Sequence, residues 1–303
     1  MTADGETNEA PGGAGGMAAA VAALKEALPE LRDAPVADLG GGLDHHAVRV
    51  GEVVLRLRGD DDEPDVTREI ALLELVRRRV PIPVPAPVAA GDAWIAYPLL
   101  AGISALTLDP QLRAGLAGPL AASLGEVLAR LWATPRAEVE GLAEDDRTPL
   151  AEWRDEAAEL AADLADELPE PVRRGLERFF AAPLPPAARA RVFSHNDLGC
   201  EHVLVEPEAG AITGIIDWSD AAVVDPAKDL GLILRDLGPE AFERAWQEAR
   251  AGLPAADDPT SRARLYAHCL ALEDLAFGLE TGRTAYVRSA RDALARLTAE
   301  SAG

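Results

Sequence analysis

Residues of the types that carry acid–base and metal chemistry are concentrated between Phe193 and Trp218. Asp197 lies five positions before His202, and Asp217 directly follows an apolar run that ends at Ile216. Because apolar strands leave polar residues at their ends, we expect these three side chains to meet at one edge of a domain. Such a group suits phosphoryl transfer, in which one carboxylate orients an acceptor hydroxyl and takes its proton while other ligands hold Mg2+ on the nucleotide phosphates. Asp197 is predicted for the first role, and His202 and Asp217 for the second.

The same segment resembles the catalytic and metal-binding motifs of the aminoglycoside phosphotransferase family. The resemblance is carried by His195-x-Asp197, His202, Ile216-Asp217-Trp218, the run Asp217–Ala221 and the run Asp225–Leu230. It extends from about Leu39 into the C-terminal helices and is specific around residues 193 to 230. It implies an α+β, bilobal protein-kinase-like fold, with a small antiparallel β-sheet N-lobe and a larger, mainly helical C-lobe. It also implies that Asp197 is the catalytic base and Asp217 the principal Mg2+ ligand, with His202 where the family most often has Asn.

Other residues of this segment are expected to support the loop. The His195 ring should hydrogen-bond to backbone, and Asp225 and Asp229 should cap a helix or pair with an arginine.

The resemblance places nucleotide binding in the N-terminal portion, with ATP or GTP as phosphoryl donor. Three glycines at 40–42 precede a predicted hairpin and would let the backbone approach phosphates closely. The family has a lysine on the next strand, but Lys25 and Lys228 are the only lysines, so Arg56 would replace it, with Arg58 as the nearby alternative. Arginine can bind phosphate in bidentate fashion. The predicted nucleotide-binding residues are Gly41, Gly42, Arg56, its partner Glu69, and the hinge residues Ala96, Tyr97 and Leu99, which are similar to the hinge of macrolide phosphotransferases.

The hydrophobic pattern separates a strand-rich N-terminal part from a helical C-terminal part. Predicted strands are 47–50, 53–57, 93–100, 203–205 and 212–216, and predicted helices are 17–28, 65–80, 110–132, 149–168, 171–180, 239–250 and 261–299. A flexible glycine loop is expected before the first hairpin. We divide the chain into a disordered tail (1–16), an N-lobe with the nucleotide-binding sheet and a helix (17–100), and a C-lobe with the catalytic loop and acceptor site (101–303).

The net charge of −23 argues against nucleic-acid binding, which needs clustered Lys and Arg to displace counterions. It would instead attract Mg2+ and polycationic substrates. No apolar run reaches the roughly 20 residues of a membrane helix, the first sixteen residues do not resemble a secretory signal, and the two cysteines have no metal-type spacing. We therefore expect a cytoplasmic monomer that does not bind membranes.

An acidic helical region is where the resembled family builds its acceptor pocket. Asp155, Glu159, Glu273 and Asp274 are the candidate acceptor-binding residues, since carboxylates suit the ammonium groups of an aminoglycoside. A solvated helix face is an equally good explanation for any one of them.

The expected function is therefore NTP-dependent phosphorylation of a small-molecule hydroxyl, with an aminoglycoside-type antibiotic as first preference and resistance as the outcome. Four alternatives remain open. The acceptor could be a macrolide, or a metabolic alcohol or sugar. The missing strand lysine would suit a nucleotide-binding module that has lost catalysis. A metal-dependent hydrolase could use the same His and Asp residues.

Overall fold

The computed structural model describes residues 14–41, 45–58, 66–253 and 257–300, and the chain divides into two compact units. The first unit contains the described residues up to Arg78 together with Val84–Leu100, and the second contains Arg79–Pro83 and the chain from Ala101 onward. Gly42 and most of the predicted tail lie outside the described residues. Among the described residues, no helix combines the length and the apolarity needed to cross a membrane.

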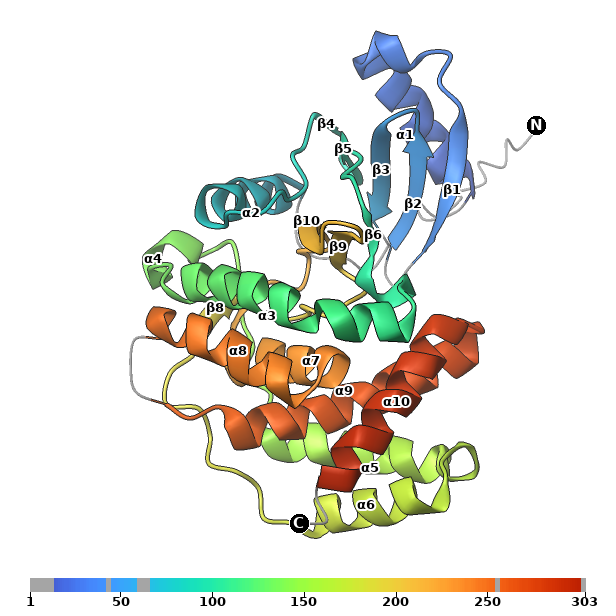
Figure 1. Cartoon of the computed structure of the whole chain (residues 1–303). Helices are drawn as coiled ribbons and strands as arrows, with labels where there is room; N and C mark the ends of the chain where they lie inside the picture. Colours follow the sequence, from blue (N-terminus) through green and yellow to red (C-terminus); the bar gives the residue numbers. More distant parts are fainter. Residues whose placement is uncertain (1–13, 42–44, 59–65, 254–256, 301–303) are drawn as a thin grey trace, which may run out of the picture. The chain divides into compact units, whose positions relative to one another are not determined.

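In the first unit, five described strands form an antiparallel sheet in the order β1-β2-β3-β5-β4 (Figure 1). The strands are β1 (Val36–Gly41), β2 (His45–Val50), β3 (Val53–Arg58), β4 (Ala89–Ala90) and β5 (Trp94–Pro98), and the helices are α1 (Ala14–Ala27), the 3-10 turn Pro29–Leu31 and α2 (Val66–Arg79). Alternate apolar side chains of β2 and β3, such as Val48 and Leu55, are buried in one cluster with Leu24 of α1. The hairpin was predicted, and the structure shows that its period-2 pattern places one face against the helix.

The prediction of a flexible loop before the hairpin is wrong, because Leu39–Gly41 belongs to strand β1. Gly40 pairs with Ala47, and an irregularity in register lies between Asp38 and Gly40. Strand pairing uses only backbone groups, so a glycine-rich segment can join a ladder that hydrophobic alternation does not indicate.

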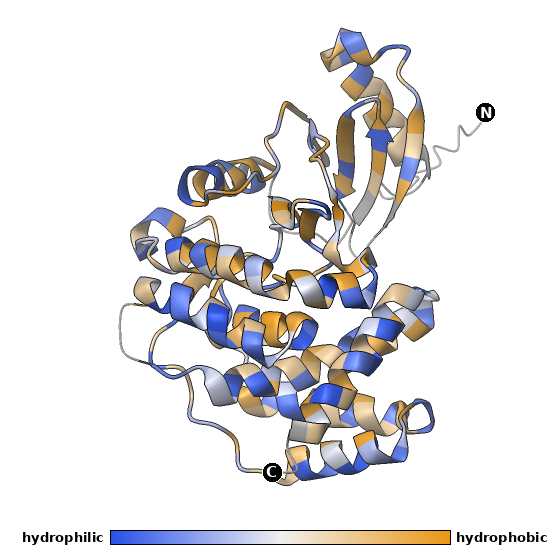
Figure 2. Ribbon diagram, viewed as in Figure 1, coloured by the Kyte–Doolittle hydropathy of each residue, from blue (hydrophilic) through white to orange (hydrophobic). Residues whose placement is uncertain are grey.

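The second unit is mainly helical. Its helices are α3 (Pro110–Trp132), α4 (Arg136–Val139), α5 (Leu150–Asp163), α6 (Glu170–Ala181), α7 (Ala227–Leu237), α8 (Pro239–Ala249), α9 (Thr260–Thr281) and α10 (Thr284–Glu300), with 3-10 turns at Ala105–Thr107, Ala165–Glu167 and Arg250–Gly252. Helix α3 packs against α8, α7 against α9, and α9 against α10 (Figure 1). Figure 2 shows polar and apolar positions alternating along these helices, the pattern expected when one stripe of each is buried.

Two glycines allow these helices to approach closely. A Cβ atom on Gly125 of α3 would lie 2.6 Å from the backbone oxygen of Ala245 in α8. A Cβ atom on Gly231 of α7 would lie 2.8 Å from the Cβ of Tyr266 in α9. Any side chain at either position would force the paired helices apart.

Two small sheets of the second unit flank the segment with the candidate catalytic residues. One contains β10 (Ala211–Ile215), β9 (Val203–Glu206) and β6 (Ile103–Ser104), in that order. The other contains β7 (Glu144–Asp145), β11 (Ala222–Val224) and β8 (Val192–Ser194), in that order. The loop 195–202 joins β8 to β9, and the loop 216–221 joins β10 to β11, so two sheets fix the ends of both loops.

Two helix predictions need correction. The expected single helix over 261–299 is two helices, because α9 ends at Thr281 and Gly282 adopts a left-handed conformation with φ of 70° that stops it. The expected helix over 149–168 ends at Asp163, and a 3-10 turn follows. Helices α4 and α7 and strands β1, β4, β6, β7, β8 and β11 were not predicted.

His268 of α9 makes folding sensitive to acid. Its ring stacks on Phe179 at 4.0 Å, Nδ1–H donates to the Arg264 carbonyl oxygen, and Nε2 has no hydrogen-bond partner among the described residues. Burial lowers the pKa of His268 to about 4, against about 6.5 for an exposed histidine. Between these values the unfolded chain binds more protons than the folded one, so stability is present above pH 6.5 and is lost as the pH falls.

We therefore expect His268 to contribute about 2 kcal/mol of destabilisation between pH 7 and pH 5. Urea unfolding of the wild type and of His268→Phe at both pH values measures it. The unfolding free energy should fall less between pH 7 and pH 5 in the variant than in the wild type, by this amount. Equal decreases in the two proteins would contradict the prediction.

Candidate active site

The structure brings Asp197, His202 and Asp217 together in the second unit. Nδ1 of His202 lies 3.3 Å from Oδ2 of Asp197, and Nε2 of the same ring lies 3.6 Å from Oδ2 of Asp217. The imidazole thus stands between two carboxylates that come from different loops. The Asp197 and Asp217 side chains are one-third and two-fifths exposed, so both can reach a ligand.

His195 joins the two loops. Its Nε2–H donates to the Ile216 carbonyl oxygen at 3.0 Å, and its Nδ1 accepts the Asp197 backbone N–H at 3.3 Å. A carbonyl can only accept, so these contacts require a neutral ring with its proton on Nε2. Burial lowers the pKa of His195, although Asp229 opposes the shift, and this also favours the neutral form. The ring therefore has the structural part predicted for it.

Two non-glycine residues of the loops have left-handed backbone conformations. Asn196 has φ of 71° and Asp217 has φ of 61°. The Asn196 side-chain amide donates to the Asp220 carbonyl oxygen at 2.9 Å, which ties the first loop to the second. Backbone strain of this kind persists where surrounding contacts hold it, and it often marks functional loops.

Asp229, in the first turn of α7, hydrogen-bonds to the loop 195–202, which is called the catalytic loop below because it contains the candidate base Asp197. Its carboxylate accepts the Ser194 hydroxyl at 2.5 Å, the Asn196 N–H at 3.0 Å and the Leu198 N–H at 3.1 Å, and it is fully buried. These bonds fix the backbone on both sides of Asp197. Asp229 is thus a structural support, as predicted, but it acts by binding the loop backbone and Ser194 and not through the expected helix cap or arginine pair.

Replacing Asp229 by Asn should disturb both stability and rate. An amide offers one acceptor oxygen and would point N–H groups at backbone N–H donors, so we expect a loss of about 2 kcal/mol in unfolding free energy. We also expect about a tenfold lower kcat because Asp197 would shift. Urea unfolding and steady-state kinetics measure both. The exposed Asp163→Asn variant of α5 is the control, and an Asp229→Asn protein indistinguishable from it would refute the role.

The pKa values of Asp197 and His202 are coupled. Burial raises the pKa of Asp197 to about 7, although the nearby His202 opposes the shift. Burial lowers the pKa of His202, but the carboxylates of Asp197, Glu201 and Asp217 outweigh it and raise this pKa to about 9. His202 has the higher pKa of the two, so without a bound cation the first proton that this pair takes up binds to the imidazole.

In the first unit, Arg56 of β3 and Glu69 of α2 form an ion pair, and both side chains are about nine-tenths buried. The sequence analysis expected Glu69 to be the partner of Arg56, and the structure contains this pair. The predicted hinge residues are largely engaged in the sheet, since the Ala96 carbonyl accepts the Val88 N–H and the Leu99 N–H donates to the Glu52 carbonyl. Tyr97 pairs with Val54 in the β3–β5 ladder, and Gly41 is the last residue of β1.

Comparison with known proteins decides the family. The profile of the phosphotransferase enzyme family matches residues 36–266, a span that includes the ion pair of the first unit and both loops of the second. The chain belongs to the phosphotransferase enzyme family. The family and the fold class predicted from the motifs are thereby confirmed.

Relatives of this phosphotransferase act on several antibiotics. Viomycin phosphotransferase from Streptomyces vinaceus is 30% identical over 191 residues, which are 59% of this chain and 63% of that enzyme, so less than two thirds of the relative is matched. The apoenzyme structure of a macrolide 2′-phosphotransferase from Brachybacterium faecium is 30% identical, covers 86% of this chain and 91% of that one, and has a TM-score of 0.55. The GDP complex of aminoglycoside 2′-phosphotransferase-IIIa is 22% identical, covers 91% of this chain and 96% of that one, and has a TM-score of 0.65. At this level of identity the likeness supports the fold alone.

The phosphotransferase also contains a buried charge cluster beside Asp197 that the sequence did not reveal. Arg235 of α7 is paired with Asp236 at 2.7 Å, with Asp274 of α9 at 2.9 Å and with Glu201 of the catalytic loop at 3.1 Å. Asp236 in turn accepts the Cys200 N–H at 2.7 Å. The arginine and its three carboxylates thus connect the catalytic loop to two helices.

The predicted acceptor residues of the phosphotransferase fall in different surroundings. Asp274 is paired with Arg235, and burial raises its pKa well above the usual range despite this pair. Glu273 is half-buried, and burial raises its pKa as well. Asp155 is exposed and pairs with its neighbour Arg154, and Glu159 is exposed. Asp274 is the one of the four that the described contacts link to the catalytic loop.

An aromatic pair near Asp197 was also missed. Tyr286 of α10 packs edge-on against Phe277 of α9 at 5.0 Å. Burial raises the pKa of Tyr286, and Glu201, Asp274 and Asp197 add to the shift, so the phenol lies within electrostatic reach of the catalytic loop. Isolated aromatic residues on two helices give no signal in the sequence that they face a catalytic loop.

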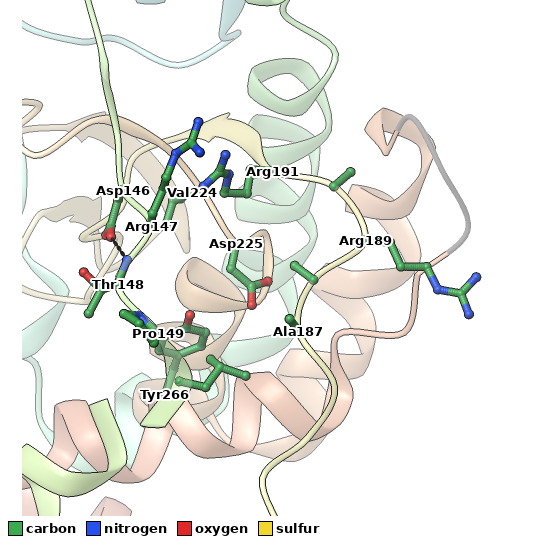
Figure 3. Close-up of a pocket in the computed structure, with 13 residues that line it drawn as sticks. Asp146, Arg147, Thr148, Pro149, Ala187, Arg189, Arg191, Val224, Asp225 and Tyr266 are labelled. Atoms are coloured by element: carbon green, nitrogen blue, oxygen red, sulfur yellow. Dashed lines mark hydrogen bonds between the residues drawn. The ribbon is translucent and has the colours of Figure 1, made fainter. Parts of the chain in front are cut away.

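A cavity of about 400 Å³ opens elsewhere in the second unit (Figure 3). Asp225 and Tyr266 line it, and Figure 3 shows Arg189 directed away from it. Val224 at its wall pairs with Val192, two residues before Ser194, so the cavity lies at the end of β8 and β11 that is remote from the catalytic loop. The Asp225 carboxylate pairs with Arg262 at 2.8 Å and accepts the Ala227 N–H, which accounts for it structurally.

Proposed function

We propose that this protein transfers a phosphoryl group from ATP or GTP to a hydroxyl of a small-molecule antibiotic, as a cytoplasmic monomer. The observation that carries the proposal is the grouping of Asp197, His202 and Asp217 at the ends of two loops in a member of the phosphotransferase enzyme family. The buried Arg56–Glu69 pair supports a retained phosphate-binding residue, and it argues against a module that has lost catalysis.

Asp197 is proposed to accept a hydrogen bond from the acceptor hydroxyl and to take its proton. Because the transition state of phosphoryl transfer is loose, the carboxylate serves as much to position the hydroxyl as to remove the proton. Asp229 and His195 hold the backbone of Asp197 in place for this task.

Asp217 and His202 are proposed to hold a divalent cation, Mg2+ in the first instance. The Asp217 carboxylate oxygen is a ligand of the kind that Mg2+ prefers, and Nε2 of His202, 3.6 Å from it, adds a nitrogen where the family most often has an amide. A bound cation would neutralise charge on the nucleotide phosphates. Gly41 and Gly42 by their backbone, and Arg56 by its guanidinium, are proposed to contact those phosphates, with Ala96, Tyr97 and Leu99 near the base.

An aminoglycoside-type acceptor is the first preference, because Glu201 and Asp274 share one arginine beside Asp197 and Glu273 adjoins Asp274 in α9, a grouping of carboxylates that suits ammonium groups. Asp155 and Glu159 stay weaker candidates for the same task. A macrolide is the second candidate, supported by the Phe277–Tyr286 pair and by the macrolide phosphotransferase relative. Viomycin is a third, from the name of the curated relative.

A coupled assay tests the proposal. Wild type and Asp197→Ala are compared with ATP and with GTP over aminoglycosides, macrolides and viomycin, and phosphorylated products are identified by mass spectrometry. We expect wild-type turnover with at least one acceptor class and almost none with the variant. Failure with every acceptor, together with normal nucleotide binding, would favour a binding module instead.

A further inference from the structure

The cavity shown in Figure 3 has an excess of positive charge at one end, although the whole chain has a net charge of −23. The guanidinium groups of Arg136, Arg147 and Arg191 all pair with Asp145, at 2.8, 2.6 and 3.2 Å. Burial would raise the pKa of Asp145, but the three arginines outweigh it and lower this pKa, so the carboxylate is ionised. One negative charge therefore faces three positive ones.

Two of these arginines line the cavity and have unused hydrogen-bond donors. Nε and Nη2 of Arg147 and Nη2 of Arg191 donate to Asp145. The other guanidinium nitrogens of both side chains make no hydrogen bond within the described part of the chain. Figure 3 shows the two side chains next to each other. Adjacent guanidinium groups with unused N–H donors suit a phosphate, whose oxygens can accept two parallel bonds from an arginine.

The far end of the cavity from the two arginines offers hydrogen-bond partners for hydroxyl groups (Figure 3). Tyr266 of α9 lines the cavity and is 3% exposed, and its hydroxyl has no hydrogen-bond partner among the described residues. A buried phenol ordinarily has such a partner, so this one indicates a ligand. Asp225 accepts the Ala227 N–H and pairs with Arg262, and its carboxylate has lone pairs for a further donor.

The remaining charged groups of the wall do not cancel the excess at the arginine end. Oδ2 of Asp146 lies 3.6 Å from Nζ of Lys228, so this carboxylate has a cation of its own. Arg262 pairs with Asp257 at 2.6 Å as well as with Asp225, and the end near Tyr266 therefore keeps negative charge. An anionic group is thus attracted to one end of the cavity, and hydroxyl donors are attracted to the other.

We propose that this cavity binds a phosphate monoester of a polyhydroxy compound, such as a sugar phosphate. The phosphate binds Arg147 and Arg191, and the two surplus positive charges match its charge of about −2. The hydroxyl groups bind Asp225 and Tyr266. The volume of about 400 Å³ is ample for a ligand of this size. The cavity lies at the end of β8 and β11 remote from the catalytic loop, so this site is distinct from the candidate active site.

Calorimetry of the full chain with glucose 6-phosphate tests the proposal. We expect binding to the wild type that weakens about tenfold in Arg147→Gln, because charge-assisted hydrogen bonds are lost. Arg174→Gln is the matched control, since Arg174 is 68% exposed, as Arg147 is, and also pairs with a carboxylate, that of Glu170. The control should bind like the wild type. Absence of binding to the wild type, or equal affinities of the two variants, would overturn the proposal.

A second set of measurements examines the hydroxyl-binding end. Tyr266→Phe removes the hydroxyl and keeps the buried ring, and it should weaken glucose 6-phosphate binding about fivefold while leaving inorganic phosphate binding unchanged. The wild type should bind inorganic phosphate more weakly than glucose 6-phosphate, and glucose more weakly than either. This ranking needs no variant and no turnover, so it is independent of folding defects and of the proposed function. Equal affinities for phosphate and glucose 6-phosphate would overturn the assignment of a polyhydroxy ligand, and equal affinities for glucose and glucose 6-phosphate would overturn the phosphate site.

Discussion

Asp197→Asn should lower kcat by about 10³-fold while changing the nucleotide dissociation constant by no more than roughly threefold. The amide has nearly the shape of the carboxylate but cannot accept the hydroxyl proton. Because Asp197 is proposed to contact the acceptor rather than the phosphates, nucleotide binding should be little affected. Steady-state kinetics with the acceptor found in the panel measure the first quantity, and calorimetry measures the second.

Asp220→Asn is the matched control for this variant. Asp220 belongs to the neighbouring loop, is exposed, and contributes to the raised pKa of Asp197 only as a minor cause. Its replacement should change kcat by less than about threefold. Comparable losses in the two variants would show that general electrostatics, and not proton acceptance by Asp197, supports the reaction.

Arg235→Met should lower the free energy of unfolding by about 3 to 5 kcal/mol. The substitution leaves Asp236, Asp274 and Glu201 without the guanidinium that pairs with all three, inside a region where the arginine itself is almost fully buried. Uncompensated buried charge is the physical reason for a loss of this size. Urea unfolding, monitored by tryptophan fluorescence, gives the value.

Two further variants test the cause. Arg244→Met on α8 removes a half-exposed arginine that pairs with Glu248, and it should cost no more than about 0.5 kcal/mol. Adding Asp274→Asn to Arg235→Met removes one of the carboxylates that has lost its arginine partner. The double variant should therefore recover part of the lost unfolding free energy. If the double variant is less stable than Arg235→Met, lost packing rather than stranded charge explains the effect.

Local signals in the sequence were sufficient for some elements. Helix α3 was predicted with both ends correct, because Pro110 occupies its first turn and the Asp109 side chain before it accepts the Gln111 N–H. The convergence of the three site residues was also predictable, since each follows or precedes a short apolar strand. In the first case the signal lies at the start of the helix, and in the second it lies in the short strands beside the site residues.

Elements set by tertiary contacts were not predictable in this way. Helix α7 is buried over almost its whole length, including Lys228, Asp229, Arg235 and Asp236, so its charged residues do not mark a solvent face. The pairing of Glu201 with Arg235 joins positions 34 residues apart, and no spacing rule indicates it. The same limit explains why the acceptor carboxylates were chosen by composition and the Phe277–Tyr286 pair was missed.

The bonds between the catalytic loop and α7 have a consequence for local unfolding. The amides of Asn196, Leu198 and Cys200 all donate to carboxylates of this one helix, Asp229 near its start and Asp236 near its end. Opening the loop would expose those carboxylates without partners, so the loop and the helix should separate from the protein as one cooperative unit. The three amides should then exchange with solvent at the slow rate of the helix interior, although they belong to a segment without regular secondary structure.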